Sequence, residues 1–337
     1  MELQTGLKMI LVTGGTGLVG SHLLRLLVQG GNKIRATRRP DSNMHLVADI
    51  ADAIEWVDAD LQEPQSLYEA MQGIEQLYHC AALISYIPKD ANNMRRINRQ
   101  GTANVVDMAL QAGIKKMVYV SSIAALGRNV KLREVNEDTT WHDSHLNSNY
   151  AISKMLAERE AWRGIAEGLD TVIVNPSVVL GRGDWQTSSC RLITRVHKGL
   201  RFYTRGGTGF VDVLDLVQIM QQLMNSPITN ERFVVNAENW LYKDFFDAVA
   251  QQLHKKPPHI LANKWLSSLA WRLEAVKCAL TGGTPLITRE TARTAREFYL
   301  YDNQKIKKVL HFSFRPLAQT IQRVCSEFIE DEQKMKQ

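Results

Sequence analysis

Near its start the chain reads Met9-Ile10-Leu11-Val12-Thr13-Gly14-Gly15-Thr16-Gly17-Leu18-Val19-Gly20, a short apolar run followed at once by a glycine-rich turn. Such a turn lets the backbone approach a pyrophosphate, which then lies on the free N–H groups of the following helix. Glycine clusters also end ordinary strands, so the meaning of the turn depends on the strand before it and the helix after it. Helix-like sequence continues to about residue 29, where Gly30-Gly31 supplies the backbone geometry that ends helices. We therefore predict a dinucleotide-binding turn whose cofactor contacts are Gly14, Thr16, Gly17, Leu18, Val19 and Gly20.

Short β-rich runs alternate with helix-like runs from residue 8 to about residue 174, the order typical of a parallel sheet covered on both faces. This order predicts an α/β fold with a doubly wound, Rossmann-like parallel sheet. In such sheets ligands bind at the carboxyl edge, so the loops that follow the strands should meet at one site. Strands are expected at residues 9–13, 33–37, 54–58, 76–80, 117–121 and 171–174.

The regular alternation stops at Asn175-Pro176, and the sequence up to residue 209 is rich in Gly, Arg and Ser. We place a boundary there, between a dinucleotide-binding domain at 1–175 and a smaller, mixed α/β substrate lobe at 176–337. The segment 210–236 is expected to return to the sheet of the first domain. Later elements are expected as strands at 210–213 and 232–235 and as helices at 243–253 and 316–328.

The composition is that of an ordinary globular protein, with 45% hydrophobic and 23% charged residues in a chain of 337. The net charge of +6 is spread along the chain, apart from a cluster formed by Arg35, Arg38 and Arg39. An anionic ligand explains this cluster. Zinc-finger spacing, RNA-binding aromatic signatures and long basic helices are missing, so no nucleic-acid partner is expected.

The cysteines Cys80, Cys190, Cys278 and Cys325 show no paired spacing, and no secretory leader precedes the first strand, so free thiols and a cytoplasmic location are expected. His142 and His145 lack a third ligand, so no metal site is expected. The longest apolar stretch, residues 265–280, contains three charges and keeps its apolar residues at helical spacing. It is expected to pack as an amphipathic helix rather than to span a membrane.

The turn after the second expected strand reads Thr37-Arg38-Arg39. Sites selective for NAD usually carry an acidic residue there, which binds the ribose diol and would repel a 2′-phosphate. An arginine fork can instead bind that phosphate in a bidentate manner. The turn therefore favours NADP, and its alternative interpretation is a solvated basic turn.

Tyr150 and Lys154 are four residues apart, so a helix would place them on one face. A nearby ammonium can stabilise a phenolate, which would make the tyrosine an acid or base at neutral pH. Ser121 and Ser122 end the fifth expected strand, where a hydroxyl would lie beside a bound cofactor. Each pattern also has a purely structural interpretation: Tyr150 and Lys154 could be an exposed pair on a helix, and the serines could cap a loop. The tyrosine, the lysine and the serines together favour a catalytic site.

Several motifs of the chain resemble those of the extended short-chain dehydrogenase/reductase superfamily, also called the NAD-dependent epimerase/dehydratase superfamily, and they occur in the same order. The resemblance covers essentially the whole chain. It rests on residues 13–20, Asp60-Leu61, His79-Cys80-Ala81-Ala82, residues 98–104, residues 118–122, Tyr150 with Lys154, and Asn175-Pro176 with Val179 and Gly181.

The resemblance implies a role for each matched residue. Ser122, Tyr150 and Lys154 would be catalytic, and Ser121 would support them, because the family places its serine five residues before a glycine like Gly127. The cofactor would further contact Asp60 and Leu61 at the adenine, and Ala81, Ala82, Tyr150, Lys154, Asn175 and Pro176.

Residues 34–40 look most like the dihydroflavonol reductase branch, in which an arginine matching Arg39 binds the 2′-phosphate. A further basic residue of that branch is not matched, since Met44, His45 and Leu46 follow here, so NAD stays possible beside NADP. The chain also departs from nucleotide-sugar epimerases, because residues 206–216 lack their Arg-Asp pair. This departure favours a smaller or apolar carbonyl substrate. The aromatic residues that would line its pocket or belong to the core are Tyr86, Trp185, Phe202 and Tyr203.

We therefore predict an NADP(H)-dependent oxidoreductase that reduces a carbonyl, or oxidises the alcohol, of a small molecule. One alternative is a sugar epimerase or dehydratase whose tightly bound cofactor is only transiently reduced. Another is a protein that senses NADP without catalysis. Helix pairing through residues 92–112 would make a homodimer, by analogy with the superfamily.

Overall fold

The computed structural model describes residues 9–128, 134–263, 271–272 and 288–334. Its centre is a seven-stranded sheet in the order β11-β7-β5-β4-β1-β2-β3, and every neighbouring pair is parallel. The doubly wound α/β fold expected from the sequence is confirmed. The strands are β1 (Met9–Thr13), β2 (Lys33–Arg38), β3 (Glu55–Asp58), β4 (Gln76–His79), β5 (Lys116–Val120), β7 (Thr171–Pro176) and β11 (Glu231–Val235).

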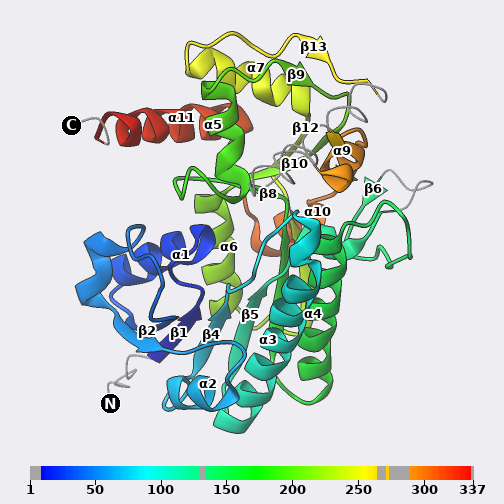
Figure 1. Ribbon diagram of the computed structural model, residues 1–337. Helices are drawn as coiled ribbons and strands as arrows, with labels where there is room; N and C mark the ends of the chain where they lie inside the picture. Colours follow the sequence, from blue (N-terminus) through cyan, green and yellow to red (C-terminus); the bar gives the residue numbers. More distant parts are fainter. Residues whose placement is uncertain (1–8, 129–133, 264–270, 273–287, 335–337) are drawn as a thin grey trace.

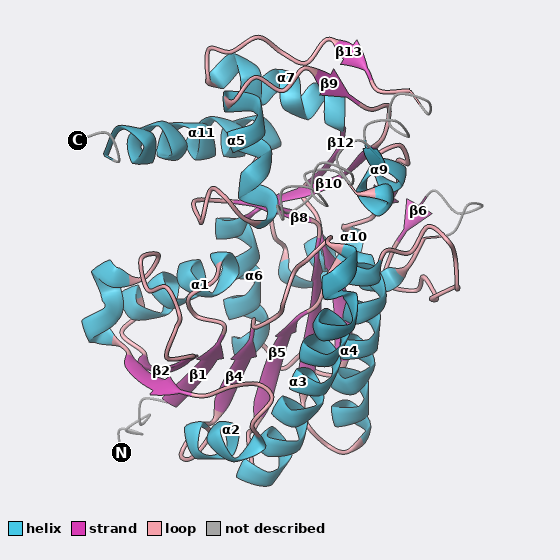
Figure 2. Ribbon diagram, viewed as in Figure 1, coloured by secondary structure: helices cyan, strands magenta, loops and turns pink. Residues whose placement is uncertain are grey.

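Helices cover both faces of this sheet (Figure 1). Neighbouring strand residues serve opposite faces, because side chains alternate along a strand. Ile10 and Val12 pack in the core that contains α1 (Leu18–Gln29) and α6 (Val213–Asn225). Leu11, between them, belongs to the core on the other face. That face carries α2 (Pro64–Ala70), α3 (Ala91–Ala112) and α4 (Asn149–Ala166), of which α3 and α4 run side by side (Figure 2).

The second part of the chain builds smaller sheets and a separate core above the carboxyl edge of the sheet (Figure 1). A three-stranded sheet joins β8 (Val178–Leu180), β10 (Gly207–Asp212) and β12 (Glu238–Leu241). Two-stranded pairs join β9 (Phe202–Tyr203) to β13 (Ile260–Leu261) and β6 (Glu134–Val135) to β14 (Leu300–Tyr301). The remaining α-helices are α5 (Arg191–His197), α7 (Tyr242–Gln252), α9 (Arg289–Thr294), α10 (Gln304–Leu310) and α11 (Leu317–Lys334). The 3₁₀ turns are η1 (Ala48–Ala53), η2 (Pro88–Asp90), η3 (Ile123–Leu126) and η4 (Ser188–Cys190).

One segment of the second part lies in the first sheet, since β11 pairs with β7 and α6 packs against α1. The strand expected over 210–213 ends at Asp212 instead. The Asp212 carboxylate accepts a hydrogen bond of 2.8 Å from the Leu214 N–H, so it caps α6, which begins at Val213. The division of the chain into domains at residue 176 stays a proposal.

Some expectations concern residues outside the described part of the chain. The stretch 265–280 lies there apart from residues 271–272, and so does Cys278. Cys80, Cys190 and Cys325 are free thiols. Among the residues with described structure, no helix combines the length and apolar character needed to cross a bilayer.

Candidate active site

The glycine turn after β1 is tightly packed, and two of its glycines, Gly14 and Gly20, admit no side chain. Gly14 has φ +70°, and a Cβ there would lie 2.7 Å from the backbone of Ala81. A Cβ at Gly20 would lie only 2.2 Å from the carbonyl oxygen of Gly14. The Gly17 N–H closes the turn by donating to that same carbonyl at 3.1 Å. The turn therefore holds the start of α1 directly against the end of β1 and the loop after β4.

The start of α1 has the properties of an anion site. No side chain caps its first turn, and no acidic residue lies in it. A Cβ at Gly17 would meet only the Gly14 oxygen, at 3.4 Å, so the space over this residue is otherwise open. Uncapped N–H groups at the positive end of a helix can hold a pyrophosphate. Thr16, Leu18 and Val19, expected beside the cofactor, are each partly exposed around this turn.

Buried His79, at the end of β4, joins three elements beneath this turn. Its Nδ1 lies 2.7 Å from the Thr13 hydroxyl, and its Nε2 lies 3.2 Å from the hydroxyl of Thr102 on α3. Burial, and to a lesser extent the charge of Lys154, lowers the pKa of His79 to about 3. The Ala81 N–H also donates to the Thr13 hydroxyl, at 3.4 Å, which places the Ala81-Ala82 loop next to the glycine turn. His79 therefore acts as a neutral structural link.

The two arginines at the end of β2 have different partners. Arg38 donates to Asp58 at 3.1 Å, and these residues face each other in the register of β2 and β3. Arg39 donates to Asp41 at 3.2 Å, and 60% of its side chain is exposed. A surface pair of this kind is worth about 0–1 kcal/mol, so it leaves the Arg39 guanidinium available to a stronger ligand.

The pair Asp60-Leu61 follows β3 and is fixed by its own hydrogen bonds. The Asp60 carboxylate accepts from the Gln62 N–H at 2.8 Å, and the Leu61 carbonyl accepts from Asn104 at 2.7 Å. A Cβ at Gly101 would lie 2.9 Å from the Leu61 side chain. Gly101 and Asn104 on α3 thus position the loop that the resemblance assigns to the adenine.

Ser122 and Tyr150 are brought together from separate parts of the chain. Ser122 follows β5 and caps η3 by accepting from the Ala124 N–H at 3.1 Å. Ser148 caps α4 by accepting from the Ala151 N–H at 3.1 Å, which places Tyr150 in the first turn of that helix. Burial raises the pKa of the Tyr150 phenol, and the Ser122 side chain opposes part of this rise. Because α4 packs against η3, Ser122 and Tyr150 lie in the same region at the carboxyl edge of the sheet.

Lys154 lies one turn further along α4 and is only 2% exposed. Its ammonium donates to the Val120 carbonyl at 2.9 Å and to the Tyr119 hydroxyl at 3.2 Å. Burial lowers its pKa to about 8, while the charge of Glu158 acts in the opposite direction. The Tyr150 pKa is shifted by burial and by Ser122. The expected stabilisation of the Tyr150 phenolate by Lys154 stays a prediction.

Glu158, one turn beyond Lys154, forms a buried network that the sequence reasoning missed. Its carboxylate accepts from Ser121 at 2.5 Å and from Asn175 at 2.7 Å. On its other oxygen it accepts from Arg232 at 3.1 Å. The sequence did contain a signal for Glu158, because Tyr150, Lys154 and Glu158 are spaced four residues apart. This spacing places all three side chains on one face of a helix.

Asn175, near the end of β7, offers a free acceptor. Its side-chain amide donates to the Ser122 carbonyl at 3.0 Å and to Glu158. Its Oδ1 is buried and has no hydrogen-bond partner among the described residues. An unpaired buried acceptor costs about 1–3 kcal/mol, which a ligand N–H would relieve. Asn175, and Pro176 after it, therefore fit a cofactor-binding role.

Of the four aromatic residues expected near the substrate, Tyr86 lies at this site. Its ring centroid is 5.7 Å from that of Tyr150. Trp185 belongs to the core instead, where it packs edge-on against Phe328. Phe202 is exposed on β9, and Lys243 lies over the ring of Tyr203.

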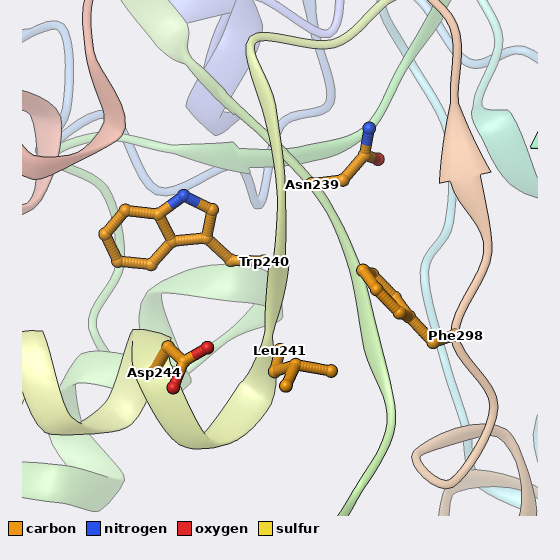
Figure 3. A pocket seen from close by; sticks show the side chains of 5 residues that line it. All are labelled: Asn239, Trp240, Leu241, Asp244 and Phe298. Carbon is orange, nitrogen blue, oxygen red and sulfur yellow. The ribbon is translucent and has the colours of Figure 1, made fainter.

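A pocket of about 320 Å³ lies in the second part of the chain (Figure 3). Asn239, Trp240 and Leu241 of β12 line it together with Asp244 and Phe298. None of these residues belongs to the expected catalytic or cofactor set.

A family model described as NAD dependent epimerase/dehydratase family matches residues 10–236, which include the glycine turn, Ser122, Tyr150, Lys154 and Asn175. The chain belongs to this family. It is an extended short-chain dehydrogenase/reductase, as its motifs indicated.

Relatives of the family resemble most of the chain. A putative dihydroflavonol 4-reductase of Synechocystis sp. is 31% identical over 305 residues, which cover 87% of each chain. Sterol demethylase protein B of Methylococcus capsulatus is 31% identical over 231 residues, which cover 68% of this chain and 70% of the relative. The crystal structure of gox2253 covers 96% of this chain and 98% of its own, with a TM-score of 0.81 and 30% identity. UDP-glucose 4-epimerase of Thermotoga maritima shares the fold, with a TM-score of 0.77 and 18% identity. The match covers 96% of this chain and 99% of that structure.

Proposed function

We propose that this protein is an NADP(H)-dependent reductase of a small carbonyl compound, which also catalyses oxidation of the corresponding alcohol. The observation that carries the proposal is the packing of α4, which contains Tyr150, against η3, which Ser122 caps at the carboxyl end of β5. Lys154 lies buried one helical turn further on. The family, and relatives named as reductases, support the same reading.

The cofactor residues would be those whose surroundings fit a dinucleotide. The pyrophosphate would lie on the uncapped start of α1, over Gly17. Asp60 and Leu61 would contact the adenine, and Ala81, Ala82, Asn175 and Pro176 would border the rest of the cofactor. When bound, NADPH would supply the hydride for the carbonyl carbon.

The side chains would supply the proton. Burial holds Tyr150 in its protonated form, so the phenol can donate its proton to the carbonyl oxygen. Ser122 would donate a hydrogen bond to the same oxygen. Lys154, with a pKa of about 8, carries a charge at neutral pH that would favour the phenolate left behind. Oxidation of the alcohol would use the same groups in reverse.

Preference for NADP would depend on Arg39, whose exposed guanidinium suits a 2′-phosphate. We expect Arg39→Met to weaken NADPH binding by about tenfold or more, since a charged hydrogen bond is worth about 1.5–3 kcal/mol, and to leave NADH binding unchanged. Arg38→Met, which removes the neighbouring arginine that pairs with Asp58, is the matched control. Equal losses for both cofactors in Arg39→Met would contradict this assignment.

The activity is tested with a panel of aldehydes and ketones, offered with NADPH and with NADH and followed by nicotinamide absorbance. A reductase consumes one NADPH for each carbonyl reduced. A sugar epimerase or dehydratase turns over nucleotide sugars with no net loss of absorbance, and a sensing protein binds NADPH and turns over neither. Either of these results would overturn the proposal.

A further inference from the structure

A second cationic side chain, Arg128, lies close to the catalytic candidates. Arg128 is six residues after Ser122 in the sequence. It directly follows Gly127, which ends η3 with φ +79°. The Arg128 N–H donates to the Asn147 side chain at 3.0 Å, and Asn147 in turn donates to the His142 carbonyl at 2.8 Å. The backbone of Arg128 is therefore fixed relative to the Ser122 turn.

The Arg128 side chain is surrounded by tyrosines. Its guanidinium carbon lies 5.9 Å from the ring centroid of Tyr299, and Tyr301 also interacts with its charge. Tyr242 and Tyr86 also interact with its charge, and these tyrosines together raise its pKa despite burial. These aromatic groups come from the loop after β4, the start of α7 and the region of β14, so the fold assembles them from distant parts of the sequence.

Within the described ranges 9–128, 134–263, 271–272 and 288–334, Arg128 forms no ion pair with Asp or Glu, whereas Arg39, Arg163 and Arg232 each do. A partly buried charge without a counter-charge is unfavourable, and an incoming anion relieves it. A guanidinium fork also matches the two oxygens of a carboxylate or phosphate.

Tyr86 connects this cation to the proposed chemistry. It interacts with the charge of Arg128 on one hand, and its ring lies 5.7 Å from that of Tyr150 on the other. The Tyr86 residue is 44% exposed, so it presents aromatic surface that a ligand can cover. A molecule that reaches Tyr150 past Tyr86 would therefore lie within the influence of Arg128.

We propose that Arg128 is a substrate-binding residue that holds an oxyanion, a carboxylate or a phosphate, of the carbonyl substrate, while the tyrosines around it contact a planar apolar part of the same molecule. This inference rests on the proposed function and narrows its substrate class to anionic carbonyl compounds. Arg128 would act in binding, and Ser122, Tyr150 and Lys154 would act in the chemical step.

The turnover test compares 4-formylbenzoate and 4-formylphenyl phosphate with neutral 4-methylbenzaldehyde. We expect Arg128→Met to raise KM for whichever anionic aldehyde the wild type prefers by about tenfold or more, with little change in kcat. KM for the neutral aldehyde should stay within about twofold, because no charged contact is lost. Arg128→Lys should restore part of the preference, since it keeps the charge and loses the fork. Arg201→Met, which removes an exposed arginine of the second part of the chain, should match the wild type.

A binding test does not depend on catalysis. Calorimetry would measure 4-(hydroxymethyl)benzoate, 4-(hydroxymethyl)phenyl phosphate and 4-methylbenzyl alcohol on the protein saturated with NADP. If no aldehyde is reduced but an anionic alcohol binds the wild type at least about tenfold more tightly than Arg128→Met, the reductase proposal fails and the anion site stands. If the wild type does not favour either anionic alcohol, or if Arg128→Met binds it equally well, the anion site is overturned.

Discussion

Replacement of Glu158 by glutamine tests the buried network that supports the catalytic candidates. This carboxylate is 3% exposed and accepts hydrogen bonds from Ser121, Asn175, Arg232 and, at 3.4 Å, Trp162. A glutamine keeps one acceptor oxygen and presents an NH₂ group in place of the other. Donors on that side then lose their acceptor, and Arg232 loses its counter-charge.

The expected loss of stability follows from these contacts. Each buried donor left unpaired costs about 1–3 kcal/mol, and removing one partner of a buried ion pair costs about 3–5 kcal/mol. These effects overlap at one side chain, so we expect the free energy of unfolding to fall by about 3–5 kcal/mol. Glu167→Gln is the matched control near the end of the same helix. That carboxylate is 45% exposed and pairs with Arg163, so its loss should cost about 0.5 kcal/mol.

The assay is urea unfolding of the two variants and the wild type, followed by circular dichroism. A pH series adds an independent readout. Burial lowers the folded-state pKa of Lys154 from the ordinary 10.5 to about 8, so between these values the unfolded chain binds more protons and stability rises with pH. Glu158 opposes this lowering, so in Glu158→Gln the rise should begin below pH 8. A loss in Glu158→Gln no larger than that in Glu167→Gln, with an unchanged pH series, would refute the reasoning.

Four further substitutions test other packing and hydrogen-bond contacts of the structure. Gly20→Ala places a Cβ 2.2 Å from the Gly14 oxygen, so it should cost about 2 kcal/mol or more in urea unfolding and abolish tight NADPH binding. Gly31→Ala, with φ +71° but open space, should cost about 1 kcal/mol. His79 has a folded-state pKa of about 3 against 6.5 in the unfolded chain, so stability falls as pH falls through this range. From pH 7 to pH 5 the wild type should therefore lose about 2 kcal/mol more stability than His79→Gln. Equal losses would contradict this expectation. Asp212→Asn breaks buried hydrogen bonds that join α6 to α11 and should destabilise by about 2–4 kcal/mol, whereas a change under about 0.5 kcal/mol would exclude this role.

The sequence predicted the elements whose determinants are local. Strand β1 and the glycine turn follow from a short apolar run and from glycines whose space and φ angle no other residue can use. Most strand and helix boundaries agree with the structure to within a few residues, because periodicity and capping residues act over one or two turns. The helix expected at 316–328 runs further, to Lys334. Where the boundary moved, as at Asp212, a side-chain cap ended the strand.

Features that depend on packing between different segments of the chain could not be predicted from the sequence. Glu158 is a single helical residue until folding places Ser121, Asn175 and Arg232 around it. Trp185 was one candidate for a substrate pocket, and its contact with Phe328 from the far end of the chain makes it a core residue. Periodicity carries no information on such contacts, since they join different elements that come together only in the folded chain.

The most direct measurement of the central claim is single-turnover reduction of an accepted aldehyde by Tyr150→Phe loaded with NADPH. Phenylalanine keeps the ring that contacts Tyr86 and removes the proposed proton donor. We predict NADPH binding within about twofold of the wild type and hydride transfer slowed by about 10²–10⁴-fold, the usual contribution of general acid catalysis. Full turnover in this variant with normal NADPH binding would contradict the account.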